Sequence, residues 1–227
     1  MKRQNGAPPC PSTIVFDLDG TLVDTAPDLT EALNAVLEAR GRARVTPHTV
    51  RTMVGHGAPA MIRAGFSATG EAAREAEMDE LLTLFLDHYS ANLSRLSRPF
   101  PGLLPLLDTL MARGVRLGVC TNKREALSIA LLEALDLKRY FPVVLGADSL
   151  PVRKPHPDHL LGTIAALGGD RSDALMVGDS ETDLATARAA GVPVLLVGFG
   201  YSPVPARDLG ADATIDHFDA FLAALPG

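Results

Sequence analysis

Short apolar segments recur along the chain, and in its second half they alternate with stretches whose apolar residues follow helical spacing. These segments predict strands at residues 13–16, 115–120, 142–145, 174–177, 193–197 and 213–215. The stretches between them predict helices at 103–112, 125–135, 157–167, 182–190 and 219–224. Strands separated by helices need crossover connections, so the pattern predicts an α/β fold with a doubly wound parallel sheet core of Rossmann-like type.

Residues 25–96 show helical spacing only and interrupt this alternation. Pro27 suits the first turn of a helix that continues to Gly41, a second helix begins at Thr46-Pro47, and a third begins near Ala58. A long fourth helix has one apolar face, formed by Met78, Leu81, Leu82, Phe85 and Tyr89. Prolines and a glycine near residue 100 end this region. We therefore expect an inserted all-helical cap domain at 25–96, an α/β core built from 1–24 and 97–227, and a loose tail at 1–12.

Two carboxylates follow the first predicted strand. Asp17 and Asp19 are two residues apart, so both emerge on one side of an extended segment and can converge on one ion or phosphorus atom. The Asp19-Gly20 pair between apolar residues also fits a β-hairpin, but residues 24–28 open a helix instead of a return strand. Ligands bind at the carboxyl ends of strands in open parallel sheets, so this segment predicts a phosphoryl-transfer site.

Polar residues also follow three later strands and should meet the first pair at the same edge of the sheet. Thr121 precedes a helix, a common setting for phosphate binding, Lys154 lies in a proline-containing loop, and Asp179 and Asp183 begin another helix. Each has a structural alternative when taken singly: a helix N-cap for Thr121, a solvated loop charge for Lys154, and helix-dipole partners for the aspartates. The ordered set favours a functional site.

Composition narrows the possible partners. The net charge of −6 and the lack of a Lys/Arg block argue against nucleic acid. No apolar run approaches the ~18 residues of a membrane span, and the first dozen residues lack the apolar stretch of a secretory signal, so we expect a cytoplasmic protein. Cys10 and Cys120 form no disulfide framework, and His156 and His159 are interpreted as surface or loop residues. An anionic substrate would need a locally positive pocket, which a divalent cation and lysines can provide.

The polar segments resemble, in order, the four motifs of the haloacid dehalogenase superfamily of phosphohydrolases. The matching residues are Asp17-Leu-Asp-Gly-Thr, Thr121, Lys154 and Gly178-Asp179-x-x-x-Asp183. Within the superfamily, the chain is most similar to the phosphoglycolate phosphatase group, through DLDGTLVDTAPDL at 17–29, VRTMVGHGA at 50–58 and RKPHP at 153–157. The resemblance covers nearly the whole chain.

The resemblance implies a role for each matching residue. Asp17 would be the nucleophile that forms an aspartyl-phosphate, and Asp19 would act first as acid and then as base. Mg²⁺ would be the cofactor, held by Asp17, the backbone carbonyl of Asp19 and Asp179, with Asp183 orienting its waters. Thr121 and Lys154 would be catalytic groups that hold the phosphoryl oxygens. The remaining substrate-binding positions would be Gly20 in the turn, Asn122 through its backbone, and Gly55, His56 and Gly57 in a loop of the cap.

The implied activity is that of a Mg²⁺-dependent phosphomonoester hydrolase acting on a small phosphorylated metabolite, with 2-phosphoglycolate the favoured substrate. Arg51 and Arg63 flank the cap loop, and either could bind a substrate carboxylate, although a solvated helix face is the more common place for an arginine. A pyrophosphatase, a sugar-phosphate phosphatase or a phosphomutase of the same superfamily stays open. So does a different class, a phosphoaspartate signalling module or a noncatalytic binding module. The sequence leaves both a monomer and a homodimer open.

Overall fold

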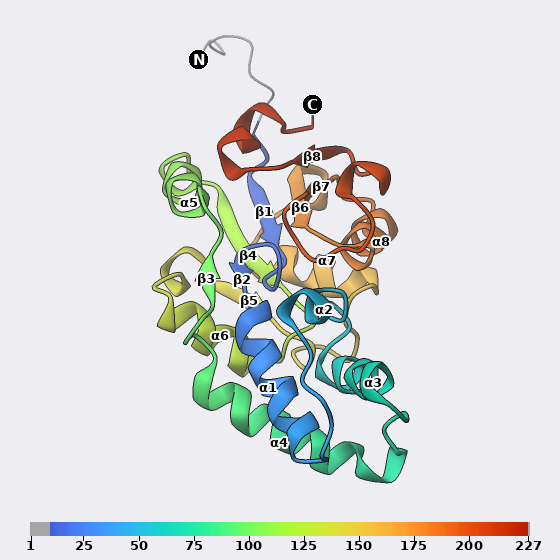
Figure 1. The fold of residues 1–227 in the computed structure, drawn as a ribbon. Helices are drawn as coiled ribbons and strands as arrows, with labels where there is room; N and C mark the ends of the chain where they lie inside the picture. Colours follow the sequence, from blue (N-terminus) through green and yellow to red (C-terminus); the bar gives the residue numbers. More distant parts are fainter. Residues whose placement is uncertain (1–9, 227) are drawn as a thin grey trace, which may run out of the picture.

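The structure is a computed structural model, and it describes residues 10–226. Six parallel strands form one sheet in the order β5-β4-β1-β6-β7-β8 (Figure 1). The strands are β1 (Thr13–Phe16), β4 (Arg116–Cys120), β5 (Val143–Leu145), β6 (Ala174–Gly178), β7 (Val194–Val197) and β8 (Ala213–Ile215). All six predicted strands are confirmed. Because the winding reverses beside β1, ligands are expected at the carboxyl end of this strand.

Alternate residues of β1 pack on opposite faces of the sheet. Ile14 and Phe16 join a cluster with leucines of α5 (Leu103–Ala112) and α6 (Glu125–Ala134). Val15 joins a cluster with α7 (Pro157–Ala166) and α8 (Glu181–Ala190). Strands buried on both faces are apolar throughout, which is why these segments stood out in the sequence. The doubly wound α/β fold is therefore confirmed.

Short 3₁₀ helices complete the connections of the sheet. They are η2 (Lys138–Tyr140), η3 (Arg171–Asp173), η4 (Ala206–Asp208) and η5 (Phe218–Ala223). The last one stands where an α-helix was expected at 219–224, and its Phe218 and Phe221 are buried in the same cluster as Ile14 and Phe16. Burial of these two rings, rather than helix propensity, holds the segment in place.

Residues 26–92 form a separate helical bundle that lies together at one end of the sheet in Figure 1. Its elements are α1 (Ala26–Glu38), α2 (Pro47–Arg51), α3 (Ala58–Thr69), η1 (Glu75–Glu77) and α4 (Met78–Asn92). Their apolar faces build one cluster around Leu33, Ile62, Leu81 and Phe85. Gly65 of α3 lets this helix approach α1 closely, since a Cβ at this position would lie 2.9 Å from the Leu33 side chain.

Two connections that join the bundle to the sheet pair with each other. β2 (Val23–Asp24) and β3 (Arg98–Pro99) form a short antiparallel ladder that the sequence pattern did not predict. The buried Asp28 carboxylate secures the second connection by accepting hydrogen bonds from the backbone N–H groups of Leu96 and Ser97 and from the Ser97 hydroxyl. β1 pairs with β4 and β6, so the hairpin alternative for the first motif is wrong.

Two expectations about individual segments change with the structure. The expected loose tail falls mostly outside the described residues, which begin at Cys10; Ser12 already bonds to the sheet region, donating its hydroxyl to the Asp173 carbonyl. His156 and His159 were expected at the surface or in a loop; His156 is exposed, but His159 is fully buried in α7. Among residues 10–226, no helix combines the length and the apolar character that crossing a membrane requires.

Candidate active site

The carboxyl ends of the strands open into a cavity of about 240 Å³ between the sheet and the helical bundle. Asp17 and Asp19 reach it from the end of β1, Thr121 and Asn122 from the end of β4, and Lys154 from the loop before α7. From the bundle come Gly55, Gly57 and a mostly apolar wall of Leu29, Val54, Met61, Leu82, Phe85, Leu86 and Tyr89. The structure therefore brings the predicted polar residues of the core together at one edge of the sheet.

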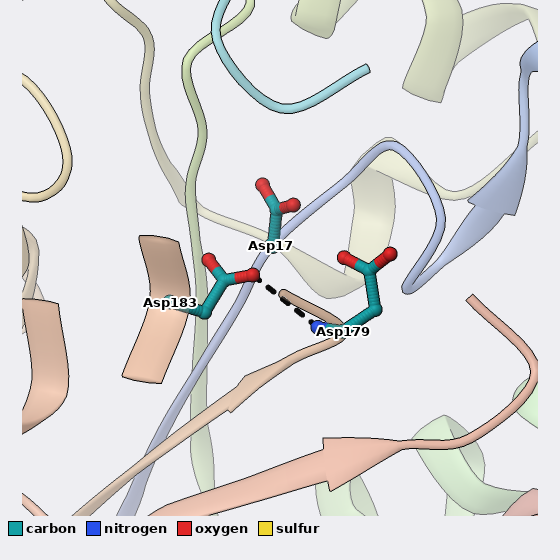
Figure 2. Close-up of side chains that lie close together, drawn as sticks. All are labelled: Asp17, Asp179 and Asp183. Carbon is teal, nitrogen blue, oxygen red and sulfur yellow. Dashed lines mark hydrogen bonds between the residues drawn. The ribbon is translucent and has the colours of Figure 1, made fainter. Parts of the chain in front are cut away.

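Three buried aspartates form an acidic cluster at this edge. Each of Asp17, Asp179 and Asp183 offers a carboxylate oxygen, and these oxygens lie within 4.8 Å of one another. Figure 2 shows the carboxylates of Asp17 and Asp179 projecting to the same side of the strand ends. Burial, opposed only in part by Lys154, raises the pKa of Asp17 to about 6. Burial and the neighbouring carboxylates also raise the pKa of Asp179 well above its ordinary value.

Lys154 is the cation nearest to this cluster. Its Nζ lies 2.7 Å from Asp17 Oδ1 and 2.6 Å from Asp183 Oδ1, with the lysine side chain only 3% exposed. Burial alone would lower the pKa of this ammonium group, but the two carboxylates raise that pKa above its ordinary value. Lys154 is therefore a fixed positive charge beside Asp17.

Asp183 is committed to hydrogen bonds within the protein. Its Oδ2 accepts from the Asp179 and Ser180 N–H groups and from the Ser180 hydroxyl, which makes it the capping-box residue of α8 (Figure 2). The structural alternative considered for Asp183 thus holds together with its place in the cluster. For Thr121 the N-cap alternative is wrong, because α6 begins after Arg124 and the Thr121 hydroxyl instead accepts from the Lys123 N–H.

Asp19 has a different partner from Asp17. The Lys123 Nζ lies 3.0 and 3.2 Å from the two carboxylate oxygens of Asp19 and 4.4 Å from the ring centroid of Tyr89 on α4. Sequence reasoning missed both Lys123 and Tyr89. Lys123 was visible as a lysine directly after Thr121-Asn122, whereas Tyr89 looked like one more apolar position of its helix.

The Asn122 side chain joins the bundle to the core. Its Nδ2 donates to the Gly55 carbonyl at 3.0 Å and to the Lys154 carbonyl at 3.1 Å. The loop at 55–57 is thereby placed over the strand ends, and Gly55 and Gly57 adopt positive φ angles of 109° and 87°. His56 is exposed and lines a neighbouring cavity of about 270 Å³ together with Asp179 and Tyr201.

A second missed feature is the loop after β7. The Tyr201 N–H donates to Asp179 Oδ2 at 2.6 Å, while the Thr21 hydroxyl donates to Asp179 Oδ1 at 3.3 Å. Asp179 packs so closely on Gly200 that a Cβ there would lie 2.2 Å from the Asp179 Cβ. Gly20 has the same role from the other side, because its φ is +87° and a Cβ would lie 2.6 Å from Asp179 Oδ2. The glycines after the predicted strand at 193–197 were the available signal.

The two arginines considered for substrate binding lie elsewhere. Arg51 forms an ion pair with Asp24 at 2.8 Å, and Arg63 forms one with Glu75 at 2.8 Å, and neither lines the cavity between sheet and bundle. Arg124 and Arg153 line this cavity instead, as exposed side chains.

The donor set suits a hard divalent cation. The site contains four carboxylates and two buried lysines, Lys123 and Lys154. The carboxylates belong to Asp17, Asp19, Asp179 and Asp183. When all are ionised, the excess of two negative charges equals the charge of one divalent cation. Carboxylate oxygens are the ligands that Mg²⁺ prefers. Burial is the main cause of the raised pKa values of Asp17 and Asp179, and the neighbouring carboxylates add to it, so a bound cation would favour the charged forms of both groups.

A family comparison decides the identity of the fold and site. Residues 14–197 match the model of the haloacid dehalogenase-like hydrolases, a segment that runs from β1 to β7. The chain belongs to this family.

Two curated relatives of this haloacid dehalogenase-like hydrolase are named phosphoglycolate phosphatase. The protein from Mesorhizobium japonicum is 49% identical, with 93% of each chain covered. The protein from Agrobacterium fabrum is 46% identical, with 93% of this chain and 91% of the relative covered. A crystal structure described as a predicted phosphoglycolate phosphatase from Haemophilus somnus has a TM-score of 0.88 and 31% identity, and the match covers 93% of this chain and 96% of that one. The predicted family and the predicted class of enzyme, a phosphatase, are confirmed.

Proposed function

We propose that this phosphatase hydrolyses 2-phosphoglycolate to glycolate and phosphate through an aspartyl-phosphate on Asp17, with Mg²⁺ as its cofactor. The observation that carries the proposal is the position of Asp17, which emerges from β1 into the cavity between Lys154 and the buried aspartates. The relatives named phosphoglycolate phosphatase support the choice of substrate.

The first half of the reaction would transfer the phosphoryl group to the protein. An Asp17 carboxylate oxygen forms a bond to phosphorus while the bond from phosphorus to the ester oxygen breaks. Asp19 delivers a proton to that oxygen, so glycolate leaves as an alcohol. Lys154, 2.7 Å from Asp17, and the Thr121 hydroxyl would hold the phosphoryl oxygens and reduce the repulsion between carboxylate and phosphate.

The second half would free Asp17 again. Asp19, now a carboxylate, accepts a proton from water as the water oxygen attacks phosphorus and the bond between Asp17 and phosphorus breaks. Inorganic phosphate then leaves. A single residue can serve as acid and then as base because Asp19 ends the first half deprotonated.

Asp17, Asp179 and the Asp19 backbone carbonyl would hold the Mg²⁺, with Asp183 acting on it through water. When bound, Mg²⁺ neutralises negative charge on the phosphoryl oxygens and the carboxylates around them. The protein's own share is to keep these groups in place, through the Tyr201 N–H and Thr21 hydroxyl on Asp179 and through Lys154 on Asp17.

The helical bundle would serve as the cap domain, with residues 25–96 as its extent and residues 1–24 and 97–227 as the core. The β2–β3 ladder is the natural hinge, because both connections between bundle and sheet pass through it. A cap that closes over the strand ends would exclude bulk water from the aspartyl-phosphate and limit the size of the leaving group.

Phosphate release from a substrate panel tests the proposal. We expect turnover of 2-phosphoglycolate to exceed that of pyrophosphate, sugar phosphates and an aryl phosphate, and to stop when the metal is chelated. Asp17→Asn should reduce turnover by at least about 10³-fold, because an amide oxygen is a poor nucleophile. A preference for pyrophosphate or a sugar phosphate would mean that 2-phosphoglycolate is not the substrate. Turnover only with a phosphorylated activator would indicate a mutase. Turnover that survives Asp17→Asn would contradict the covalent mechanism.

A further inference from the structure

Lys123 is a second buried cation in the cavity, and the chemistry at phosphorus does not use it. Its side chain is 5% exposed and lies against Asp19, not against Asp17. An ammonium group has three N–H donors, of which the two oxygens of Asp19 can take two. The Tyr89 ring, with its centroid 4.4 Å from Nζ, is the other neighbour of this ammonium group, and an anionic ligand in the cavity would compete with it for the third N–H.

Tyr89 supplies a second donor at the same place. The residue is 1% exposed, and its hydroxyl has no hydrogen-bond partner within residues 10–226. A buried hydroxyl without a partner destabilises the folded protein, so such a group in a cavity wall points to a ligand that completes it. The Tyr89 ring already contacts the Lys123 ammonium at 4.4 Å.

We propose that Lys123 and Tyr89 form a leaving-group subsite that binds the carboxylate of a phosphorylated carboxylic acid. The subsite rests on the proposed function and deepens it by assigning the residues that select the substrate. Asp19 meets the ester oxygen in the proposed reaction, and only one methylene group separates that oxygen from the carboxylate of 2-phosphoglycolate. A lysine that touches Asp19 is therefore within reach of this carboxylate.

The surroundings of Lys123 favour it over the arginines at the cavity mouth. Arg124 and Arg153 are exposed, and ion pairs of exposed groups contribute little to binding. Lys123 lies instead beside the apolar wall of α4 that includes Phe85, where a charge pair is screened less. The arginines are suited to attracting anions toward the cavity, and the lysine to holding a carboxylate inside it.

The test compares 2-phosphoglycolate with ethyl phosphate, which has the same ester linkage but no carboxylate. Tyr89→Phe removes only the hydroxyl, and Lys123→Gln removes the charge while it keeps a donor. We expect each to lower kcat/KM for 2-phosphoglycolate by about 10- to 100-fold and to lower kcat/KM for ethyl phosphate by a clearly smaller factor. The ratio of the two values is the readout, because a general loss of folding or of the Asp19 contact lowers both alike.

Two matched variants serve as controls. Tyr140→Phe removes the hydroxyl of another buried tyrosine, which donates to Asp108 outside the cavity, and should leave the ratio unchanged. Arg153→Gln tests the rival position at the mouth. Equal losses on both substrates for the Tyr89 and Lys123 variants, or a ratio that collapses in Arg153→Gln alone, would overturn the subsite. A wild-type enzyme that turns over ethyl phosphate as well as 2-phosphoglycolate would overturn the substrate proposal as well.

Discussion

Two buried lysines face two aspartates that come from the same strand end. Lys154 contacts Asp17 and Lys123 contacts Asp19, because each carboxylate is met by a different loop of the core. Carboxylates with different surroundings can take different parts in one reaction. In the proposed mechanism Asp17 is the nucleophile and Asp19 is the acid and base. The contacts of Asp17 with Lys154 and of Asp19 with Lys123 already give these two carboxylates different surroundings.

His159 carries a pH dependence of stability. Burial and the nearby Lys154 ammonium lower the pKa of His159 to about 4, below its ordinary value of 6.5. The unfolded chain therefore binds the proton more readily than the folded protein does. The contribution of His159 is present in full above about pH 6.5 and is lost as the pH falls toward 4, by on the order of 3 kcal/mol.

Urea unfolding at several pH values measures this effect. His159→Asn, which keeps an acceptor for the Lys154 N–H, should flatten the fall in the free energy of unfolding between pH 6.5 and 4. His48→Gln, at an exposed position, should keep the wild-type slope. Parallel slopes in wild type and His159→Asn would mean that the buried imidazole does not resist protonation.

At this scale the sequence predicted the residues whose chemistry is visible in their type and spacing. Asp17, Asp19, Thr121, Lys154 and Asp179 all reach one strand edge as expected. Lys123 and Tyr89 could not be assigned, because their contact depends on how the bundle is set over the sheet. The burial of His159 was missed for a similar reason. The prolines near it indicate a loop, but they do not indicate which face of the following helix, α7, packs against the sheet.

Asn122 links two elements that are far apart in the sequence, the bundle loop at 55–57 and the loop that carries Lys154. Asn122→Ala removes both hydrogen bonds and should loosen the bundle against the core. We expect KM for the substrate to rise by about 5- to 30-fold, with a smaller change in kcat, since each bond contributes about 1 kcal/mol. Steady-state kinetics, with hydrogen exchange of residues 52–57, measures both consequences.

Asn34→Ala is the matched control for this variant. The Asn34 side chain also makes two hydrogen bonds to backbone groups, but both are with Val45 inside the bundle. Asn34→Ala should lower the free energy of unfolding by about as much as Asn122→Ala does, while KM and the hydrogen exchange of residues 52–57 stay near the wild-type values. An Asn122 variant that behaves like the Asn34 variant would reduce the link to an ordinary structural contact.

Most elements could be predicted because their apolar pattern is long enough to read. β2 and β3 could not, since each has two residues and exists only because the connections between bundle and sheet run side by side. The last helix was wrong in type, because a segment with two buried phenylalanines satisfies a 3₁₀ helix as well as an α-helix. Element types fail where tertiary contacts, not local periodicity, decide the conformation.

The fold of the whole molecule brings three carboxylates together in a buried, negatively charged cluster at the strand ends. Asp17 and Asp179 lie in one cluster, and burial raises the pKa of both. A charge of this kind lowers the stability of the folded state and creates a site for a divalent cation at once. Stability and metal binding should therefore respond in opposite directions to the same substitution.

Asp179→Asn tests this coupling. At pH 7.5 with chelator, the variant should melt at the same temperature as wild type or above it, because one repelling charge is gone while an amide oxygen can still accept from Tyr201. Mg²⁺ at about 100 times its Kd should raise the Tm of the wild type by about 5–10 °C and leave the variant unchanged. Scanning calorimetry with and without Mg²⁺ gives both values.

Asp208→Asn, an exposed aspartate outside the cluster, should keep the full Mg²⁺ shift. A shift that survives in Asp179→Asn would place the cation elsewhere, and a metal-free variant that melts well below wild type would mean that the Tyr201 and Thr21 contacts, not repulsion, dominate at Asp179. We expect Asp179→Asn to be stable but inactive and to show no Mg²⁺ response. This combination follows only if the acidic cluster lowers the stability of the folded protein and at the same time forms the metal site.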